Sequence, residues 1–278
     1  MTRSWTAADA RRVLRRPTAA DDKYSRGVLG VRTGSDAYPG AAVLGVEAAW
    51  RTGLGMVRYL GPRHPTSLVL ARRPETVAAD GRVQAWVIGS GTDASTRDDA
   101  ETERLRELLE GSLPVVVDAG ALDLAVGASA PRIVTPHDRE HARLRSALGL
   151  GDPDSDRAGS ARGTARALGA VVLLKGAVTI IASPDGDVIE VDAGTPWLAT
   201  AGTGDVLAGV IGALAASATA ESEETDAASL AAVAATGAWL HGRAGHRASE
   251  ARDGGPITAL DVAESLPRAV AELLAGAP

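Results

Sequence analysis

The sequence predicts an α/β protein of three layers, α/β/α, whose central sheet is mostly parallel with an antiparallel edge region. Three observations predict this fold class. Short apolar runs first alternate with longer helix-like stretches, three further runs then follow one another across short turns, and the last part of the chain is helical. No linker or repeat interrupts the pattern, so we expect one domain over residues 1–278, with residues 1–20 as an N-terminal extension or helix.

The first half of the chain is expected to supply the parallel strands. They are residues 27–33, 56–60, 84–89, 114–119 and 132–135. Helices are expected between them, because residues 41–50 are rich in alanine and residues 101–110 and 141–148 have the apolar spacing of surface helices. Strands that alternate with helices form a parallel sheet covered on both faces.

The second half begins with a different pattern. Residues 171–174, 178–182 and 187–191 are β-rich runs linked by short turns, one of which is Pro184-Asp185-Gly186, so we expect antiparallel pairing there. Three helices are then predicted, at residues 204–217, 227–248 and 259–275.

The composition excludes several classes of function. Apolar residues make up 45% and charged residues 23% of the 278 residues, which suits a folded domain with a sizeable core. The formal net charge of −6 and the scarcity of aromatic residues argue against nucleic acid as a partner. The absence of cysteine excludes disulfides and thiolate chemistry. Without a signal peptide or a long apolar run, we expect a cytoplasmic protein with no membrane span.

One segment indicates chemistry on a phosphate group. Two glycines surround Thr203 in the motif Gly202-Thr203-Gly204-Asp205, which joins a strand region to the start of an apolar helix. Glycine permits close approach of the backbone, and the free N–H groups at a helix start bind anions, so residues 202–204 are a candidate anion hole. Asp205 would accept a proton from a substrate hydroxyl there, or would only cap the helix.

The motif and its surroundings resemble those of ribokinase-like kinases, and further segments are similar to one branch of them, the NAD(P)H-hydrate dehydratases. The resemblance extends from about Lys23 to Leu266, and the similar segments follow one another along the chain in the same order as in the family. These segments are Gly34-Ser35, Tyr38-Pro39-Gly40-Ala41, residues 51–57, 87–91, Val117-Asp118-Ala119, Thr135-Pro136-His137, Lys175 to Thr179, Ser183 to Gly186, Thr195-Pro196 and Ala199 to Asp205.

The resemblance implies a metabolite-repair lyase. A nucleotide, expected to be ADP with ATP as the alternative, would phosphorylate the C6 hydroxyl of NADH hydrate or NADPH hydrate, and loss of phosphate would restore NADH or NADPH. Mg²⁺ is expected with the nucleotide, and a homo-oligomer, a tetramer, is expected from the family. Asp205 is the implied catalytic base. The implied substrate residues are Ala41, Gly91, His137 and Asp205, and the implied nucleotide residues are Lys175, Gly176, Ala177, Val178, Thr179 and Gly204.

Other hypotheses stay open at this point. A kinase of the same fold would stop after phosphoryl transfer, and a silent module would bind a nucleotide without turnover. His137, Glu140 and His141 have a spacing found in zinc peptidases, although a chance match at a helix start explains it as well. Gly89, Gly91 and Ala94 loosely match a dinucleotide fingerprint of oxidoreductases.

Five positions depart from the family pattern. They are Asp22, Ala37, Asp93, Arg139 and Thr195. The departures concern expected substrate contacts, and Arg139 would either crowd the site or contact a phosphate. The Gly-Thr-Gly-Asp block is intact.

Overall fold

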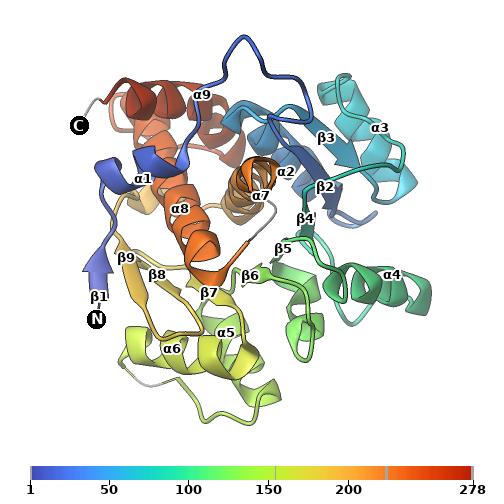
Figure 1. Ribbon diagram of the computed structural model, residues 1–278, viewed down its shortest axis with the longest axis vertical. Coiled ribbons are helices and arrows are strands. Elements are labelled where there is room, and N and C mark those ends of the chain that lie inside the picture. The colour runs from blue at the N-terminus through green and yellow to red at the C-terminus, as the bar shows by residue number, and fades with distance from the viewer. Residues whose placement is uncertain (1, 154, 223–224, 277–278) are drawn as a thin grey trace.

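A single sheet runs through the centre of the protein (Figure 1). The structure is a computed structural model that describes residues 2–153, 155–222 and 225–276. Within these residues nine strands pair in the order β1-β9-β8-β7-β6-β5-β4-β2-β3. The strands are β1 (Thr2–Ser4), β2 (Val28–Arg32), β3 (Met56–Tyr59), β4 (Ala85–Ile88), β5 (Val115–Val117), β6 (Arg132–Val134), β7 (Val171–Leu174), β8 (Thr179–Ala182) and β9 (Val188–Val191).

The directions of the strands confirm the mostly parallel sheet and its antiparallel region. β8 is antiparallel to both β7 and β9, and every other pair is parallel. The outermost strand on that side is β1, which pairs in parallel with β9 and which the sequence did not reveal. Its three residues are exposed, so they have no apolar pattern to detect.

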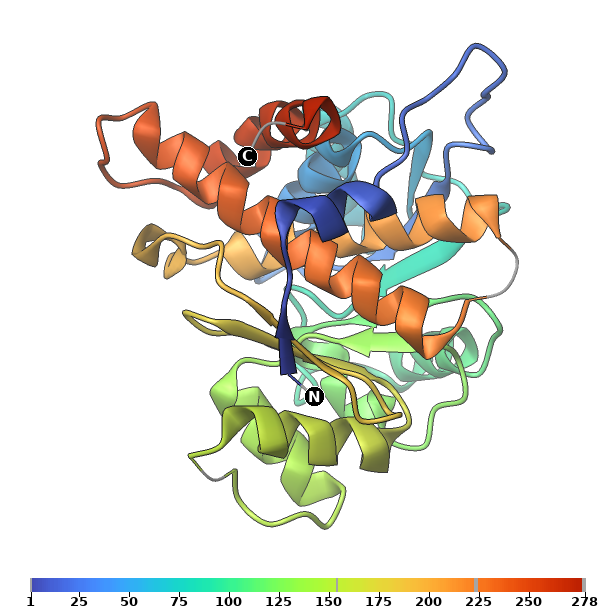
Figure 2. The ribbon, with the colours of Figure 1, turned by 60° about the vertical axis from the view of Figure 1, so that its left-hand side comes forward.

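Helices cover both faces of the sheet (Figure 2). On one face lie α1 (Ala7–Val13), α2 (Pro39–Thr52), α3 (Arg63–Arg72), α7 (Thr203–Glu221), α8 (Ala227–Glu250) and α9 (Ala259–Ala275). On the other lie α4 (Asp99–Leu109), α5 (Asp138–Ala147), α6 (Arg157–Leu168) and the 3₁₀ helix η1 (Ala119–Ala125). A second 3₁₀ helix, η2 (Pro196–Leu198), precedes α7. The three-layer architecture is confirmed.

The strands have apolar residues on both sides because each side is a core. In β5, Val116 packs into the core beneath α7, while Val115 and Val117 pack into the core beneath α4 and η1. Successive residues of a strand point to opposite faces, so a strand between two helical layers is apolar throughout. This explains why the short apolar runs located the central strands.

Helix α7 packs against both the sheet and its neighbouring helices. A methyl group added at Gly209 would lie 2.2 Å from the carbonyl oxygen of Gly45, which shows how closely α7 crosses α2. By length and composition α7 alone among the described helices could cross a membrane, with a mean hydropathy of 1.4. In this fold 67% of its apolar window is buried, as in the core helix of a globular domain.

Candidate active site

The start of α7 has the local structure of an anion site. Gly202 is the N-cap with φ 90°, a backbone conformation that favours glycine, and a Cβ there would also lie 2.6 Å from Leu44 Cδ1 and 3.0 Å from the Cβ of Ala259. The Thr203 hydroxyl contacts the carbonyl oxygens of Leu198 at 2.8 Å and Thr200 at 2.9 Å, which fixes the turn. The first amides of the helix, including that of Gly204, have no partner within the helix and suit a phosphate.

Buried polar groups gather beside this turn, at the carboxyl ends of neighbouring parallel strands. Asp118, which follows β5, accepts hydrogen bonds from Lys175 Nζ at 3.0 Å and Thr135 Oγ1 at 2.8 Å through Oδ1. Its Oδ2 accepts one from Ser90 Oγ at 2.9 Å. Lys175 Nζ also lies 3.7 Å from Glu140 Oε2. Parallel strands end at the same edge of the sheet, which brings these four segments together.

The charges in this cluster set the protonation of Asp205. Burial raises the pKa of Asp205, the negative charge of Asp118 adds to the rise and the positive charge of Lys175 opposes it, and together they place this pKa at about 7. Burial would lower the pKa of Lys175, but the carboxylates of Asp118 and Glu140 outweigh it and raise that pKa, so Lys175 is a cation. The site thus pairs a carboxyl that titrates near neutral pH with a fixed positive charge.

A cavity of about 650 Å³ opens on one side of this cluster. It lies between the β7–β8 turn, the segment after β9, the start of α7 and the side of α8. Lys175, Gly176, Ala177, Thr179 and Gly204, which were expected to bind the nucleotide, all line it, whereas Val178 does not. A methyl group on Gly204 would lie 3.8 Å from Lys175 Nζ, so the ammonium group stands over the first amides of α7.

Arg157 holds the β7–β8 turn in place from the start of α6. Its Nη2 donates to the carbonyl oxygen of Lys175 at 2.8 Å, and its Nη1 donates to that of Val178 at 3.0 Å. Nη2 also lies 3.0 Å from Asp138 Oδ1 at the start of α5. The sequence does not reveal the role of Arg157, because a contact from this side chain to a backbone carbonyl 18 residues downstream leaves no local motif.

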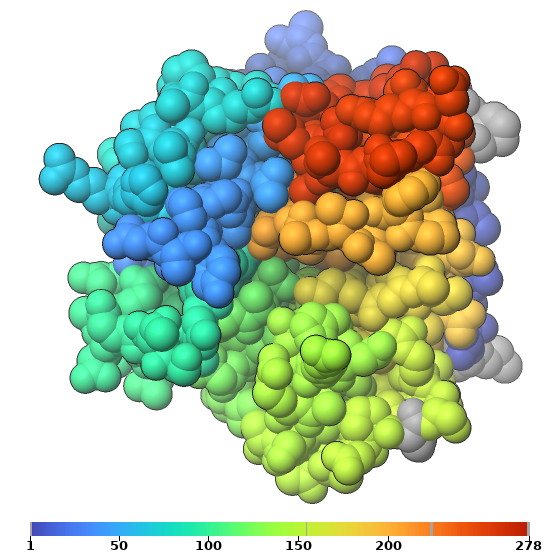
Figure 3. All heavy atoms as spheres, turned by 180° about the vertical axis from the view of Figure 1, so that it is seen from behind, coloured from blue at the N-terminus to red at the C-terminus, as the bar shows by residue number. Residues whose placement is uncertain are grey.

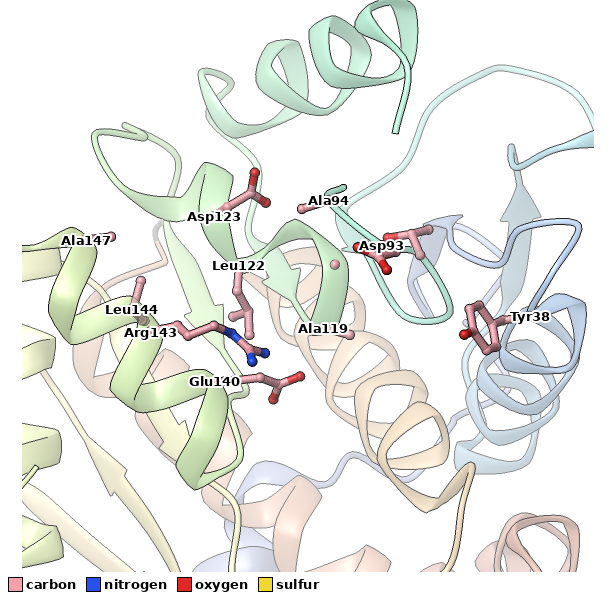
Figure 4. A pocket seen from close by; sticks show the side chains of 12 residues that line it. Tyr38, Asp93, Ala94, Ala119, Leu122, Asp123, Glu140, Arg143, Leu144 and Ala147 are labelled. Carbon is pink, nitrogen blue, oxygen red and sulfur yellow. The ribbon is translucent and has the colours of Figure 1, made fainter. Parts of the chain in front are cut away.

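A second cavity, of about 590 Å³, lies on the other side of the cluster (Figure 4). It is lined by side chains from the start of α2, the loop after β4, η1 and α5. One of them, Glu140, lies 3.7 Å from Lys175 Nζ and so borders both the cavity and the cluster. Figure 3 shows the hollowed face where the blue, green and orange segments of the chain meet.

None of the residues expected to bind the substrate, Ala41, Gly91, His137 and Asp205, is itself among those that line this cavity, but the first three contact residues that do or lie next to them. Gly91 has φ 66°, and a Cβ there would lie 2.4 Å from the Cβ of Ala41 and 2.9 Å from the carbonyl oxygen of Tyr38. The structure therefore brings Ala41 and Gly91 together beside Tyr38, which lines the cavity. His137 is the N-cap of α5, one turn before Glu140.

The His-x-x-Glu-His spacing does not form a zinc site. His137 Nδ1 accepts the N–H of Arg139 at 3.1 Å as a helix cap, and Glu140 Oε2 accepts the N–H of His137 at 2.8 Å. His141 Nε2 instead lies 2.8 Å from Thr164 Oγ1 between α5 and α6, where burial lowers the pKa of His141 to about 4. The two imidazoles do not converge, so the zinc hypothesis is wrong; among the residues described here, no three potential ligands meet.

The glycines after β4 do not open a helix, as a dinucleotide fingerprint would require. Gly91 packs against α2, and the next helix, α4, begins only at Asp99. Of the departures from the family pattern, Asp93 lines the second cavity and Thr195 the first. The remaining departures lie in a turn or on the surface, and they are Asp22, Ala37 and Arg139.

The parallel sheet with its antiparallel region has the ribokinase-like fold, which a protein of Enterococcus faecalis shares with a TM-score of 0.82 at 21% identity. Residues 29–268 match the NAD(P)H-hydrate dehydratase family. The chain belongs to that family.

Two curated relatives and one solved structure illustrate the similarity. The bifunctional NAD(P)H-hydrate repair enzyme of Mycobacterium tuberculosis is 50% identical over 212 residues, which are 72% of this chain and 43% of that protein. The ADP-dependent (S)-NAD(P)H-hydrate dehydratase of Neisseria meningitidis is 34% identical over 80% of this chain and 77% of its own length. The ADP/ATP-dependent NAD(P)H-hydrate dehydratase of Bacillus subtilis, crystallised with ATP and Mg²⁺, superimposes with a TM-score of 0.83, 28% identity and 98% coverage of both chains. The chain spans about half or less of the length of the bifunctional relatives it matches.

Proposed function

We propose that this protein dehydrates the C6 hydrates of NADH and NADPH at the expense of a nucleotide. One observation supports this most strongly: two cavities, each large enough for a substantial part of a nucleotide, flank the cluster of Asp118, Lys175 and Glu140 beside Asp205. Phosphoryl transfer between two bound substrates requires such an arrangement, because donor and acceptor must meet while water is kept out.

Asp205 is proposed as the base of the first step. Its carboxylate accepts the proton of the C6 hydroxyl, the hydroxyl oxygen forms a bond to the terminal phosphorus of the nucleotide, and the bond from that phosphorus to the bridging oxygen breaks. The amides at residues 202–204 and the Lys175 ammonium group stabilise the negative charge of the transferred group. AMP leaves if the donor is ADP, and ADP leaves if it is ATP.

Elimination completes the reaction. The C6–O bond breaks with loss of phosphate, and a proton leaves C5, so that the C5=C6 double bond of the dihydronicotinamide is restored. Hydroxide is a poor leaving group and phosphate is a good one, which is the chemical reason for consuming a nucleotide.

Mg²⁺ is proposed to enter with the nucleotide. No three-ligand group of histidine and carboxylate residues occurs among the described residues, and both oxygens of Asp118 already accept hydrogen bonds. This donor set suits a cation held mainly by phosphate oxygens and water, as Mg²⁺ commonly is. When bound, the ion would neutralise charge on the phosphates. We propose ADP as the donor, in line with the name of the Neisseria relative.

The direct test supplies NADH hydrate, Mg²⁺ and either ADP or ATP and follows the absorbance of the reduced nicotinamide. Recovery with one donor, together with release of inorganic phosphate, supports the proposal. A stable phosphorylated product without recovery would indicate a kinase. Nucleotide binding without turnover of either hydrate would indicate a silent module. Light scattering on the same sample tests the expected tetramer.

The rate should depend on the ionisation of Asp205. Because burial raises its pKa to about 7, the base is mostly protonated below that pH, and kcat/KM should fall about tenfold for each pH unit below it. Nucleotide phosphate also titrates near pH 6, so the nucleotide Kd is measured over the same range and the profile is corrected for it. A corrected profile that stays flat down to pH 5 would contradict the role of Asp205 as base.

Arg157→Gln should weaken nucleotide binding through the shape of the β7–β8 turn. Loss of the two bonds to the carbonyl oxygens of Lys175 and Val178 frees the turn, and we expect the nucleotide Kd to rise about tenfold, measured by calorimetry. Arg162→Gln is the matched control: Arg162, on the same helix, donates to the carbonyl oxygen of Gly186 at 3.0 Å, in the turn between β8 and β9. Equal effects of both substitutions would indicate only a general loss of structure.

A further inference from the structure

The second cavity contains a cationic side chain that the reaction described above does not use. Arg143 on α5 lines this cavity, as does Tyr38 before α2, and Figure 4 shows both side chains from close by. Arg143 is the one lysine or arginine among the described residues that line it. It forms no ion pair or hydrogen bond with other described residues.

The carboxylates of the same cavity are already engaged. Asp123 is held by Arg97 through two nitrogens, at 3.1 Å and 2.5 Å. Glu140 accepts the N–H of His137 and lies beside Lys175. Hydrogen bonds from Ser95 hold the pKa of Asp93 below its usual range, with a smaller contribution from Arg143. Arg143 is therefore the cationic group that this cavity presents to a ligand.

The position of Arg143 relative to the reacting groups indicates which part of a ligand it meets. Arg143 is three residues after Glu140 on α5, about 5 Å along the helix axis, and Figure 4 shows its guanidinium group directed toward Glu140, whose carboxylate lies 3.7 Å from Lys175 Nζ. The reacting ring belongs at the cluster near Lys175 under the proposed function, so a group bound by Arg143 is the part of the same substrate that follows the ring. In a dinucleotide hydrate that position is occupied by phosphates.

Tyr38 adds a second kind of contact. Its side chain is 60% exposed, an unusual state for a large aromatic residue. An exposed aromatic ring beside a guanidinium group is a common combination for nucleotides, because the ring stacks on a base or sugar while the guanidinium group pairs with phosphate oxygens. Phe is absent from this chain and Tyr occurs three times, so few residues could supply such a surface.

We infer that the second cavity binds the phosphate-bearing part of the dinucleotide hydrate, with Arg143 pairing with a phosphate and Tyr38 packing against a base or sugar. This inference rests on the proposed function and adds to it the residues that determine affinity for the substrate. The phosphate is either the pyrophosphate, which both hydrates contain, or the 2′-phosphate, which only NADPH hydrate contains.

The test compares Arg143→Gln with Arg139→Gln, an exposed arginine one turn earlier on α5 that does not line the cavity. We expect Arg143→Gln to raise KM about tenfold with kcat nearly unchanged, because the contact stabilises bound substrate throughout the reaction. Arg139→Gln should leave both constants within about twofold of wild type. Tyr38→Ala should raise KM, and Tyr38→Phe should restore it.

The two hydrates identify the phosphate. An equal rise of KM for both hydrates assigns Arg143 to the pyrophosphate, and a rise for NADPH hydrate alone assigns it to the 2′-phosphate. Unchanged KM for both overturns the inference. Binding of NADPH is measured in parallel through the fluorescence of its reduced nicotinamide. If the wild-type protein binds NADPH but repairs no hydrate, the proposed function fails. The inference is then decided separately, by whether Arg143→Gln loses affinity for NADPH.

Discussion

Asp205→Asn is expected to lower kcat about a thousandfold, because general base catalysis contributes up to this order and asparagine cannot accept the proton. The nucleotide Kd should stay within about twofold, since the side chain is not part of the lining of the nucleotide cavity. Steady-state kinetics and calorimetry measure the two effects separately. Asp36→Asn, in the exposed loop before α2, is the matched control and should keep full activity.

The same substitution should make the protein more stable. A carboxyl whose folded pKa is raised to about 7 destabilises the fold when it ionises, so the penalty grows as pH rises above its ordinary value of 3.8 and is complete above pH 7. Asp205→Asn removes it, and we expect about 2 kcal/mol of added stability at pH 8 after allowing for the partial exposure of the side chain. The difference should vanish near pH 4. A variant that is both inactive and less stable would indicate misfolding and would contradict this account.

Glu47→Ala is expected to destabilise the fold by about 3 kcal/mol, since Glu47 is a fully buried carboxylate on which three arginines converge. Glu47 Oε1 accepts hydrogen bonds from Arg51 Nε at 2.5 Å, Arg73 Nη2 at 2.6 Å and Arg72 Nη2 at 3.2 Å. Urea unfolding measures the change. Glu264→Ala is the control: it removes an exposed partner of Arg72 and should cost less than about 1 kcal/mol.

Acid should reverse the stabilisation by Glu47. Burial opposes ionisation, but the arginines outweigh it and lower the pKa of Glu47 to about 2 from its ordinary 4.5. The stabilisation is therefore complete above pH 4.5 and is lost as pH falls toward 2. Wild type and Glu47→Ala should differ in stability at pH 6 and converge near pH 2. Equal stability of the two proteins at pH 6 would show that solvation of the arginines compensates for the lost carboxylate.

Local sequence patterns located the elements that are buried and regular. The runs at β2 to β7 could be found because strands between two helical layers are mostly apolar, α7 and α8 because they are rich in apolar residues, and α9 because its apolar residues recur at helical spacing. β1, with three exposed residues, had no such pattern. The start of α7 was also predictable, because a left-handed N-cap such as Gly202 requires glycine whatever the rest of the fold does.

Contacts between distant residues were beyond the sequence. The ion pair of Lys175 with Asp118 joins residues 57 positions apart, and Arg157 reaches its turn from another helix. His137, Glu140 and His141 had the spacing of a metal site, and only their directions in space showed a helix cap and a buried hydrogen bond.

Local patterns along the chain suffice for the layered fold, the family and the glycine turn at the start of α7, since these follow from the order of apolar runs and from residues whose backbone conformation is local. Tertiary structure decided which charges meet, which cavities open beside them and how readily Asp205 ionises. The physical reason is that burial and charge proximity, which set the pKa of Asp205, exist only after strands far apart in the chain end at one edge of the sheet.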